Sequence, residues 1–159
     1  GKSSVAMLVE RKLIELGRPA YVLDGDNLRH GLNSDLGFSM ADRSENLRRL
    51  AHIATLMADS GQIVLVPAIS PLEEHRELAR KVHTDQGFEF FEVFMDTPLA
   101  DCEARDPKGL YAKARAGEIT HFTGIDSPYQ RPKNPDLQLS PDDLDAQAQR
   151  VVDMLVAPR

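Results

Sequence analysis

Residues that can bind phosphate stand at the very start of the sequence. Gly1-Lys2-Ser3-Ser4 leads into apolar residues at helical spacing, and Gly17 follows as a helix stop. Gly-Lys-Ser at a helix N-terminus is the second half of the phosphate-binding loop G-x-x-x-x-G-K-[ST]. In such a loop the backbone N–H groups and the helix dipole attract phosphate, the lysine reaches the phosphate oxygens and the serine hydroxyl holds Mg²⁺. The segment therefore predicts a site for a nucleoside triphosphate.

The phosphate-binding motif is only half present. Its first glycine, and the strand that precedes it in such loops, are not in the sequence, and the tetrapeptide by itself is also compatible with a chance match. We expect the missing half in residues that come before Gly1, so that the chain is a fragment. The preceding strand would then lie in the interior of the sheet.

A short acidic turn follows the first predicted strand. Asp24-Gly25-Asp26 and, three residues later, Arg29 place two carboxylates and a guanidinium within about one helical turn. A kinase needs a carboxylate to hold Mg²⁺ or to orient the acceptor hydroxyl, and an arginine to bind an anionic substrate. The alternative for Asp26 is a helix N-cap. On the next helix, Arg43 and Asn46 could contact an anion and a base edge, or could simply form a solvated face.

A polar stretch near residues 106–135, here called the lid, is too long to be a plain connection. Four basic residues occur among the eleven from Arg105 to Arg115, and glycines flank them. This composition suits a segment that closes over phosphates and excludes water, with Phe122 as a base-stacking residue. The alternative is a solvated basic helix face.

Strands and helices alternate along the rest of the sequence. Nearly all-apolar strands are expected at 20–23, 63–66, 88–95 and 137–139, and helix starts at the capping patterns Asp42–Glu45, Ser70–Glu73, Thr97-Pro98 and Ser140–Asp143. Buried strands separated by helices predict an α/β fold, with a parallel sheet covered by helices on both faces, in one domain over residues 1–159. Ligands of such folds bind beyond the carboxyl ends of the strands, here Asp24–Asp26, Ala68–Ser70 and Asp96.

Composition excludes several classes of protein. The 159 residues carry a formal net charge of −6, which argues against non-specific binding to nucleic acid or to an anionic membrane. The single cysteine, Cys102, cannot form an internal disulfide and is expected in a helix core. Apolar runs fall short of the roughly 20 residues that span a bilayer. We therefore expect a cytoplasmic protein.

An aspartate at the end of the strand next to the phosphate loop would indicate a motor or switch NTPase. The strand at 63–66 lacks one, and Asp96, which ends a later strand, is followed by Thr97-Pro98 and is expected at a helix entry. The N/T-K-x-D motif that reads guanine does not occur. A small-molecule kinase fits these residues better than a motor or a GTP-driven switch.

Longer motifs resemble the adenylylsulfate kinase (APS kinase) family, which phosphorylates the 3′-hydroxyl of adenosine 5′-phosphosulfate. The matching segments are GKSS at 1–4, DGDNLRHGLNSDLGFS at 24–39, DRSENLRR at 42–49, ISP at 69–71, CEARDPKGLYAKARAGEI at 102–119 and FTGIDSPYQRP at 122–132. They span nearly the whole chain in the expected order. Leu72 departs from the pattern, because the family often has an aromatic residue there.

The resemblance implies a role for each matching residue. ATP and Mg²⁺ would be bound by Gly1, Lys2, Ser3, Ser4 and Arg105, with Ser3 and Asp26 on the metal. Catalysis would involve Lys2, Asp24 and Asp26, of which Asp26 would orient or deprotonate the 3′-hydroxyl. Adenosine 5′-phosphosulfate would be held by Asp26, Arg29, Phe38, Arg43, Asn46, Ile69, Ser70, Lys108, Leu110 and Phe122. Phe122 would pack on the adenine opposite Phe38. The family is also described with a phosphorylated serine at the position of Ser70, which we interpret first as a substrate contact.

The resemblance also implies partners. Family members are commonly homodimers, and some are fused to the ATP sulfurylase that makes their substrate. Two other functions remain open at this point: a non-catalytic nucleotide-binding module that reports to a fused partner, and another small-molecule phosphate-loop kinase.

Overall fold

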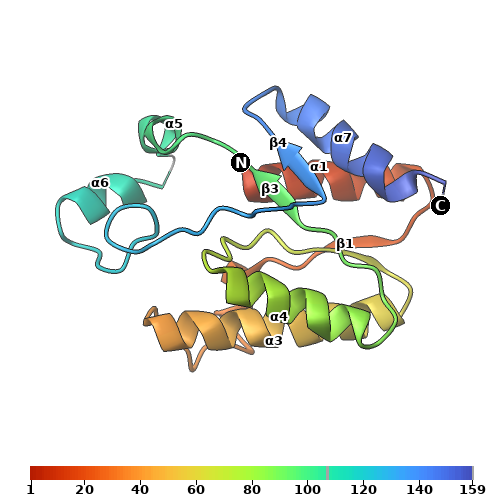
Figure 1. The fold of residues 1–159 in the computed structure, drawn as a ribbon, viewed down its shortest axis with the longest axis horizontal. Coiled ribbons are helices and arrows are strands. Elements are labelled where there is room, and N and C mark those ends of the chain that lie inside the picture. The colour runs from red at the N-terminus through yellow and green to blue at the C-terminus, as the bar shows by residue number, and fades with distance from the viewer. Residues whose placement is uncertain (107, 159) are drawn as a thin grey trace.

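Helices and short parallel strands alternate along the chain, as the sequence predicts (Figure 1). The structure is a computed structural model that describes residues 1–106 and 108–158, so Pro107 of the lid lies outside the described residues. The elements are α1 (Lys2–Glu15), β1 (Ala20–Val22), α2 (Gly25–Leu28), α3 (Met40–Asp59), β2 (Ile63–Leu65), α4 (Glu73–Thr84), β3 (Val93–Met95), α5 (Leu99–Arg105), α6 (Leu110–Arg115), β4 (Leu137–Leu139) and α7 (Leu144–Val156).

The four strands form two parallel pairs. β1 pairs with β2, with Ala20 opposite Ile63, and β3 pairs with β4, with Val93 opposite Leu137. α1 and α7 lie on one side of the strands, and α3 and α4 lie on the other (Figure 1). The predicted α/β fold with parallel strands and helices on both faces is thus confirmed. A further strand supplied by residues before Gly1 stays a prediction.

Alternation along β2 shows how the two faces are built. Ile63 and Leu65 pack against the core under α1 and α7, whereas Val64 between them packs against Leu50 and the other buried residues on the α3 side. Successive strand side chains point to opposite faces, so three residues serve both cores. The larger core joins α1, β4 and α7 through Val5, Val9, Leu13, Leu139, Ala148, Val151 and Val152.

The capping pattern predicted at Asp42–Glu45 is wrong, because α3 begins at Met40. The Ser39 hydroxyl accepts the N–H of Asp42 at 3.1 Å, and it donates to the Asp42 carboxylate at 2.7 Å. Ser39 and Asp42 thus form the same kind of cap three residues earlier. Glu45 instead forms ion pairs with Arg48 and Arg49.

The pattern at Ser70–Glu73 is also wrong as a helix start. α4 begins at Glu73, its N-cap Leu72 gives no side-chain cap, and the Glu73 N–H is bound instead by the Gln130 side chain at 2.7 Å. Ser70 adopts a φ of +41°, which lies outside the helical region.

The third strand is shorter than predicted and covers only Val93–Met95 of 88–95. Its partner β4 begins at Leu137, whose N–H binds the carbonyl of Glu92. The backbone before Glu92 bonds to α4 and not to a strand. The N–H of Phe88 binds a carbonyl near the end of α4, and Arg80 of α4 donates to the Phe90 carbonyl. The pattern predicted at Ser140–Asp143 is confirmed only in its last residue: α7 begins at Leu144, and the Asp143 carboxylate, in place of Ser140, accepts two N–H groups at its start. Across the described part of the chain, every helix is too short or too polar to cross a membrane.

Two leucines of α3 test the core on the α3 side. Leu50 is 2% exposed and Leu56 is 71% exposed. We expect Leu50→Ala to lower the free energy of unfolding by about 2–5 kcal/mol, because it leaves a cavity. The matched variant Leu56→Ala should change it by less than about 0.5 kcal/mol. Urea denaturation measures both, and equal losses would contradict this assignment of the core.

Candidate active site

The start of α1 is built to receive an anion. Gly1 is the N-cap without a side-chain cap, its carbonyl accepts the N–H of Val5 at 2.9 Å, and the first turn carries no acidic residue. The first N–H groups of a helix have no acceptor within the helix, and the positive end of the helix dipole lies there. The amides of Lys2, Ser3 and Ser4 therefore form the kind of site that binds phosphate.

Lys2 extends this site toward the acidic turn. Burial lowers the pKa of its ammonium below the usual value, and the charges of Asp26 and Asp24 raise it again. The three groups are close enough for their charges to interact, although they come from α1 and from the segment after β1. The structure thus brings together the phosphate-binding and acidic motifs that the sequence predicts.

Asp24 organises the acidic turn. One of its carboxylate oxygens accepts the N–H of Asp26 at 2.9 Å and caps α2, and the other accepts the hydroxyl of Ser3 at 3.2 Å. β1 leads directly into this turn, because Leu23 still bonds to the Leu65 carbonyl of β2. The end of the strand pair therefore fixes Asp24 beside the start of α1.

These oxygens decide which metal would fit. A hydroxyl and a carboxylate are hard donors of the kind that Mg²⁺ prefers, and Mg²⁺ takes few protein ligands and completes its shell with water and phosphate oxygens. Among the residues that the structure describes, no cluster of three or more His, Cys, Asp or Glu could hold a metal by itself. The residues thus fit a magnesium ion that arrives with phosphate. Ser3 is bonded to Asp24, and the sequence reasoning that placed the metal on Ser3 and Asp26 had missed this pairing.

Lys108 of the lid pairs with the other acidic residue. Its ammonium lies 3.4 Å from the Asp26 carboxylate, and both side chains are exposed. Asp106 supports this arrangement, because its carboxylate accepts the N–H groups of Tyr111 and Ala112 and holds the start of α6.

α5, which precedes the lid, and α6, which lies within it, form this side of the site. The salt bridge from Arg115 to Glu103 at 2.7 Å ties α6 to α5. Arg105 lies at the end of α5. Burial is the main cause that lowers the pKa of the Gly1 amine, and the charge of Arg105 helps to lower it. A contact of Arg105 with ATP stays a prediction. Leu110 begins α6. Cys102, expected in a helix core, is half-buried in α5.

Two arginines form a second basic group beyond the acidic turn. Arg29 donates to the carbonyl of Gly37 at 2.8 Å, and its guanidinium lies 4.6 Å from the centre of the Phe38 ring. Arg43 donates to the Phe38 carbonyl at 2.9 Å. Burial lowers the pKa of Arg43, the charge of Arg29 lowers it further and that of Asp126 raises it. One cation over an exposed ring and a second bound to the backbone of the same residue suit an anionic substrate with an aromatic base.

The part of the lid that carries Phe122 also carries Asp126, whose charge acts on Arg43 of this basic group. The Asp126 carboxylate accepts the N–H groups of His121 and Phe122, and the same carboxylate acts on Arg43. Phe122 packs edge-to-face on Tyr111, with ring centres 5.0 Å apart. Asp126 was not among the predicted site residues, although its motif was. An adenine between Phe38 and Phe122 stays a prediction.

Other predicted site residues have structural roles in the absence of ligand. Asn46 is buried, and its carbonyl accepts the amide of Asn33 at 2.9 Å. Ile69 is exposed after β2, and Ser70 beside it has the positive φ. Asp96 was expected at the entry of α5 and does not cap that helix. It binds Arg131 and Gln138 instead.

Comparisons with known proteins agree with this geometry. Residues 1–140 match the family described as adenylylsulphate kinase. The chain is 81% identical over 98% of its length to the bifunctional enzyme CysN/CysC of Mycobacterium tuberculosis, of which it covers 25%. It is 56% identical over 86% of its length to adenylyl-sulfate kinase of Clostridium acetobutylicum, of which it covers 67%.

The fold of the chain is also similar to that of a solved structure. The structure of the Mycobacterium tuberculosis APS kinase CysC in complex with AMPPNP and APS superposes with a TM-score of 0.95. It is 81% identical, and the match covers 98% of this chain and 90% of that one. With its phosphate-binding helix, acidic turn and family match in agreement, this chain belongs to the adenylylsulphate kinase family.

Proposed function

We propose that this domain transfers the γ-phosphoryl group of ATP to the 3′-hydroxyl of adenosine 5′-phosphosulfate. The products are ADP and 3′-phosphoadenosine 5′-phosphosulfate. The observation that carries the proposal is the hydrogen bond of 3.2 Å from Ser3 to Asp24, which joins the start of α1, next to Lys2, to the acidic turn. The relative whose structure is described in complex with AMPPNP and APS supports both substrates. The chain spans a quarter of the bifunctional relative, so activity in a longer protein is part of the proposal.

Binding of ATP would use the start of α1. The amides of the first turn and the ammonium of Lys2 would neutralise the phosphates, with Gly1 and Ser4 lining the loop and Arg105 near it. Ser3 and Asp26 would hold Mg²⁺, and Asp24, which accepts the Ser3 hydroxyl and the Asp26 N–H, supports both as ligands. The ion would supply charge neutralisation of the transferred group when bound.

Transfer to the hydroxyl would depend on Asp26. The oxygen of the 3′-hydroxyl forms a bond to the γ-phosphorus while the bond from that phosphorus to the β–γ bridging oxygen breaks, and the hydroxyl proton passes to Asp26. Lys108, which holds Asp26 in the free protein, would turn to the phosphates as the lid closes. Such transfer needs positioning and charge neutralisation more than covalent help from the protein.

Adenosine 5′-phosphosulfate would lie across the second basic group. Arg29 and Arg43 provide two guanidinium groups for the phosphosulfate, and Phe38 and Ile69 expose apolar surface for the base. Phe122 and Leu110 would close from the lid, while Ser70 and the buried Asn46 shape the floor.

Partners and location follow the family. Relatives named bifunctional enzymes support a domain that works joined to a second enzyme, which we propose is ATP sulfurylase. We also propose a homodimer in the cytoplasm, and the molar mass of the purified protein in solution would test the dimer.

Product analysis tests the function. The full-length protein with ATP, Mg²⁺ and adenosine 5′-phosphosulfate should release ADP together with 3′-phosphoadenosine 5′-phosphosulfate. ADP release with shikimate or gluconate alone would assign another small-molecule kinase. Tight calorimetric binding of adenosine 5′-phosphosulfate without turnover would assign a non-catalytic module.

Asp26→Asn tests the proposed base. We expect kcat to fall by about 10²- to 10⁴-fold, because the amide cannot take the proton. Asp59→Asn, at the exposed end of α3, is the matched control and should keep kcat. Steady-state kinetics with circular dichroism on each variant separates chemistry from folding, and an unchanged kcat would remove Asp26 from the mechanism.

Arg29→Ala tests the acceptor clamp. Removing a charged hydrogen-bond donor should raise KM for adenosine 5′-phosphosulfate by about 10- to 100-fold. KM for ATP should change little, since ATP would bind at α1. Arg18→Ala, in the exposed loop after α1, serves as the control, and an unchanged acceptor KM in Arg29→Ala would refute the clamp.

A further inference from the structure

We infer that Arg76 is a positioning residue for the acceptor, which holds the Ile69-Ser70 loop in its binding conformation with Glu92 as a brace. The inference rests on the proposed function, because it deepens the role of that loop. Arg76 is the fourth residue of α4, and the sequence motifs assigned it no role.

The loop needs a restraint because its backbone is strained. Ser70 has a φ of +41°, in the region that glycine adopts easily and serine rarely does. Residues kept in such conformations persist where their surroundings hold them. The restraint at Ser70 is a hydrogen bond of 2.8 Å to its carbonyl from Nη1 of Arg76.

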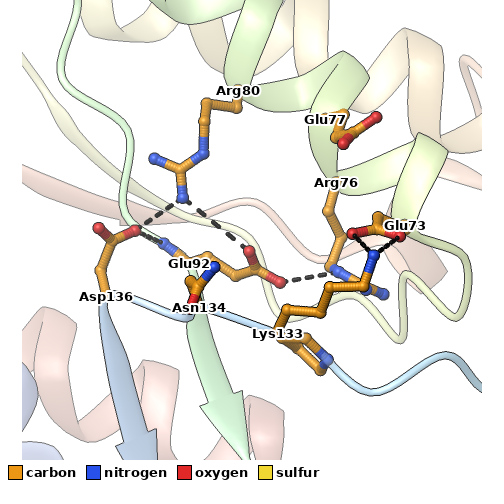
Figure 2. A pocket seen from close by; sticks show the side chains of 9 residues that line it. Glu73, Arg76, Glu77, Arg80, Glu92, Lys133, Asn134 and Asp136 are labelled. Carbon is orange, nitrogen blue, oxygen red and sulfur yellow. Dashed lines mark hydrogen bonds and ion pairs between the residues drawn. The ribbon is translucent and has the colours of Figure 1, made fainter.

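Glu92 lies against the guanidinium that makes this bond and pairs with its charge. Nε of Arg76 lies 2.7 Å from the Glu92 carboxylate in an ion pair without hydrogen-bond geometry, and the two side chains are only 10% and 18% exposed. Figure 2 shows Arg76 reaching Glu92 from α4 and Asp136 beside Glu92. The Glu92 N–H is bound in turn by the Asp136 carboxylate at 2.7 Å, and Asp136 pairs with Arg80 at 2.8 Å. A planar guanidinium can serve Glu92 on one edge and Ser70 on another, whereas a lysine ammonium is a single point on a flexible stem.

The last part of the lid contacts the other side of the same turn. The N–H of Gln130 binds the Pro71 carbonyl at 2.8 Å, and its side chain binds the Glu73 N–H. Lys133 pairs with Glu73 at 3.0 Å. The turn from Ser70 to Glu73 is therefore held by Arg76 from α4 and by Gln130 from the last part of the lid.

The cavity beside Arg76 is lined by side chains that pair with one another, and we interpret it as structural support and not as a ligand site. It measures about 390 Å³ and is lined by Glu73, Arg76, Glu77, Arg80, Glu92, Pro132, Lys133, Asn134 and Asp136 (Figure 2). Its three cations are each paired with one of its carboxylates. The cations are thus all paired, and the fourth carboxylate, Glu77, makes the lining unsuited to an anion. The pairing with Arg76 keeps Ser70, next to the exposed side chain of Ile69, in place.

Arg76→Lys tests the inference, with Arg11→Lys as the matched control. Lysine at 76 can still pair with Glu92 but cannot also hold the Ser70 carbonyl. We expect KM for adenosine 5′-phosphosulfate to rise by about 3- to 10-fold, the effect of one hydrogen bond. KM for ATP should stay within about twofold, because α1 is not involved. Arg11→Lys makes the same exchange at an exposed arginine of α1 that pairs with Glu15, and both KM values should stay at the wild-type level.

The outcomes separate a positioning role from a structural one. A lowered melting temperature in Arg76→Lys with an unchanged acceptor KM, or an equal rise in both KM values, would overturn the inference. Should Arg76→Lys not fold, Glu92→Gln carries the test, since it keeps the shape of the brace without its charge and should raise the acceptor KM alone. If the wild-type protein gives no turnover, the proposed function fails, and the calorimetric Kd for adenosine 5′-phosphosulfate replaces KM in the same comparison.

Discussion

The contact between the start of α1 and the acidic turn is the constraint on which the arrangement of the site depends. The Ser3 hydroxyl donates to the Asp24 carboxylate at 3.2 Å, beside Lys2. Burial lowers the pKa of the Lys2 ammonium, and the charges of Asp26 and Asp24 offset this only in part. The helix that carries Lys2 also supplies Val5, Val9 and Leu13 to the main core. The position of the phosphate-binding residues is therefore set by core packing, and the acidic turn is set by the end of β1 against β2. A rigid scaffold of this kind suits a reaction in which placement does most of the catalytic work.

Local patterns predicted the elements and the groups of site residues well. Apolar runs gave all four strands, and the family motifs at 1–4 and 24–29 converge at one end of the strands. The errors are at helix starts, where two candidate caps compete. Ser39 caps α3 in preference to Asp42 because the Ser39–Asp42 pair satisfies both partners, and α4 starts at Glu73 because Gln130 replaces the expected side-chain cap. That partner lies 57 residues away in sequence, so no local pattern could have identified it.

The same reason explains the site residues that the sequence did not reveal. Asp126 lies in a recognised motif, but the effect of its charge on Arg43 depends on the tertiary position of the lid, which is far from Arg43 along the chain. The Ser3–Asp24 bond joins residues 21 positions apart and depends on strand pairing. Arg76 and Glu92 appear in the sequence as ordinary charges on a solvated helix and a strand end. Their nearly buried pairing distinguishes them from the exposed ion pairs nearby.

The contact between Lys108 and Asp26 has a consequence for how firmly the lid is attached to the acidic turn. An exposed ion pair of this kind contributes little to stability and breaks readily. While it lasts, the pair joins the lid to the acidic turn. Because solvent surrounds both side chains, either of them can exchange its partner for water or for a dissolved ion at little cost. The contact between the lid and the acidic turn is therefore reversible, and rising salt concentration weakens it by screening the two charges.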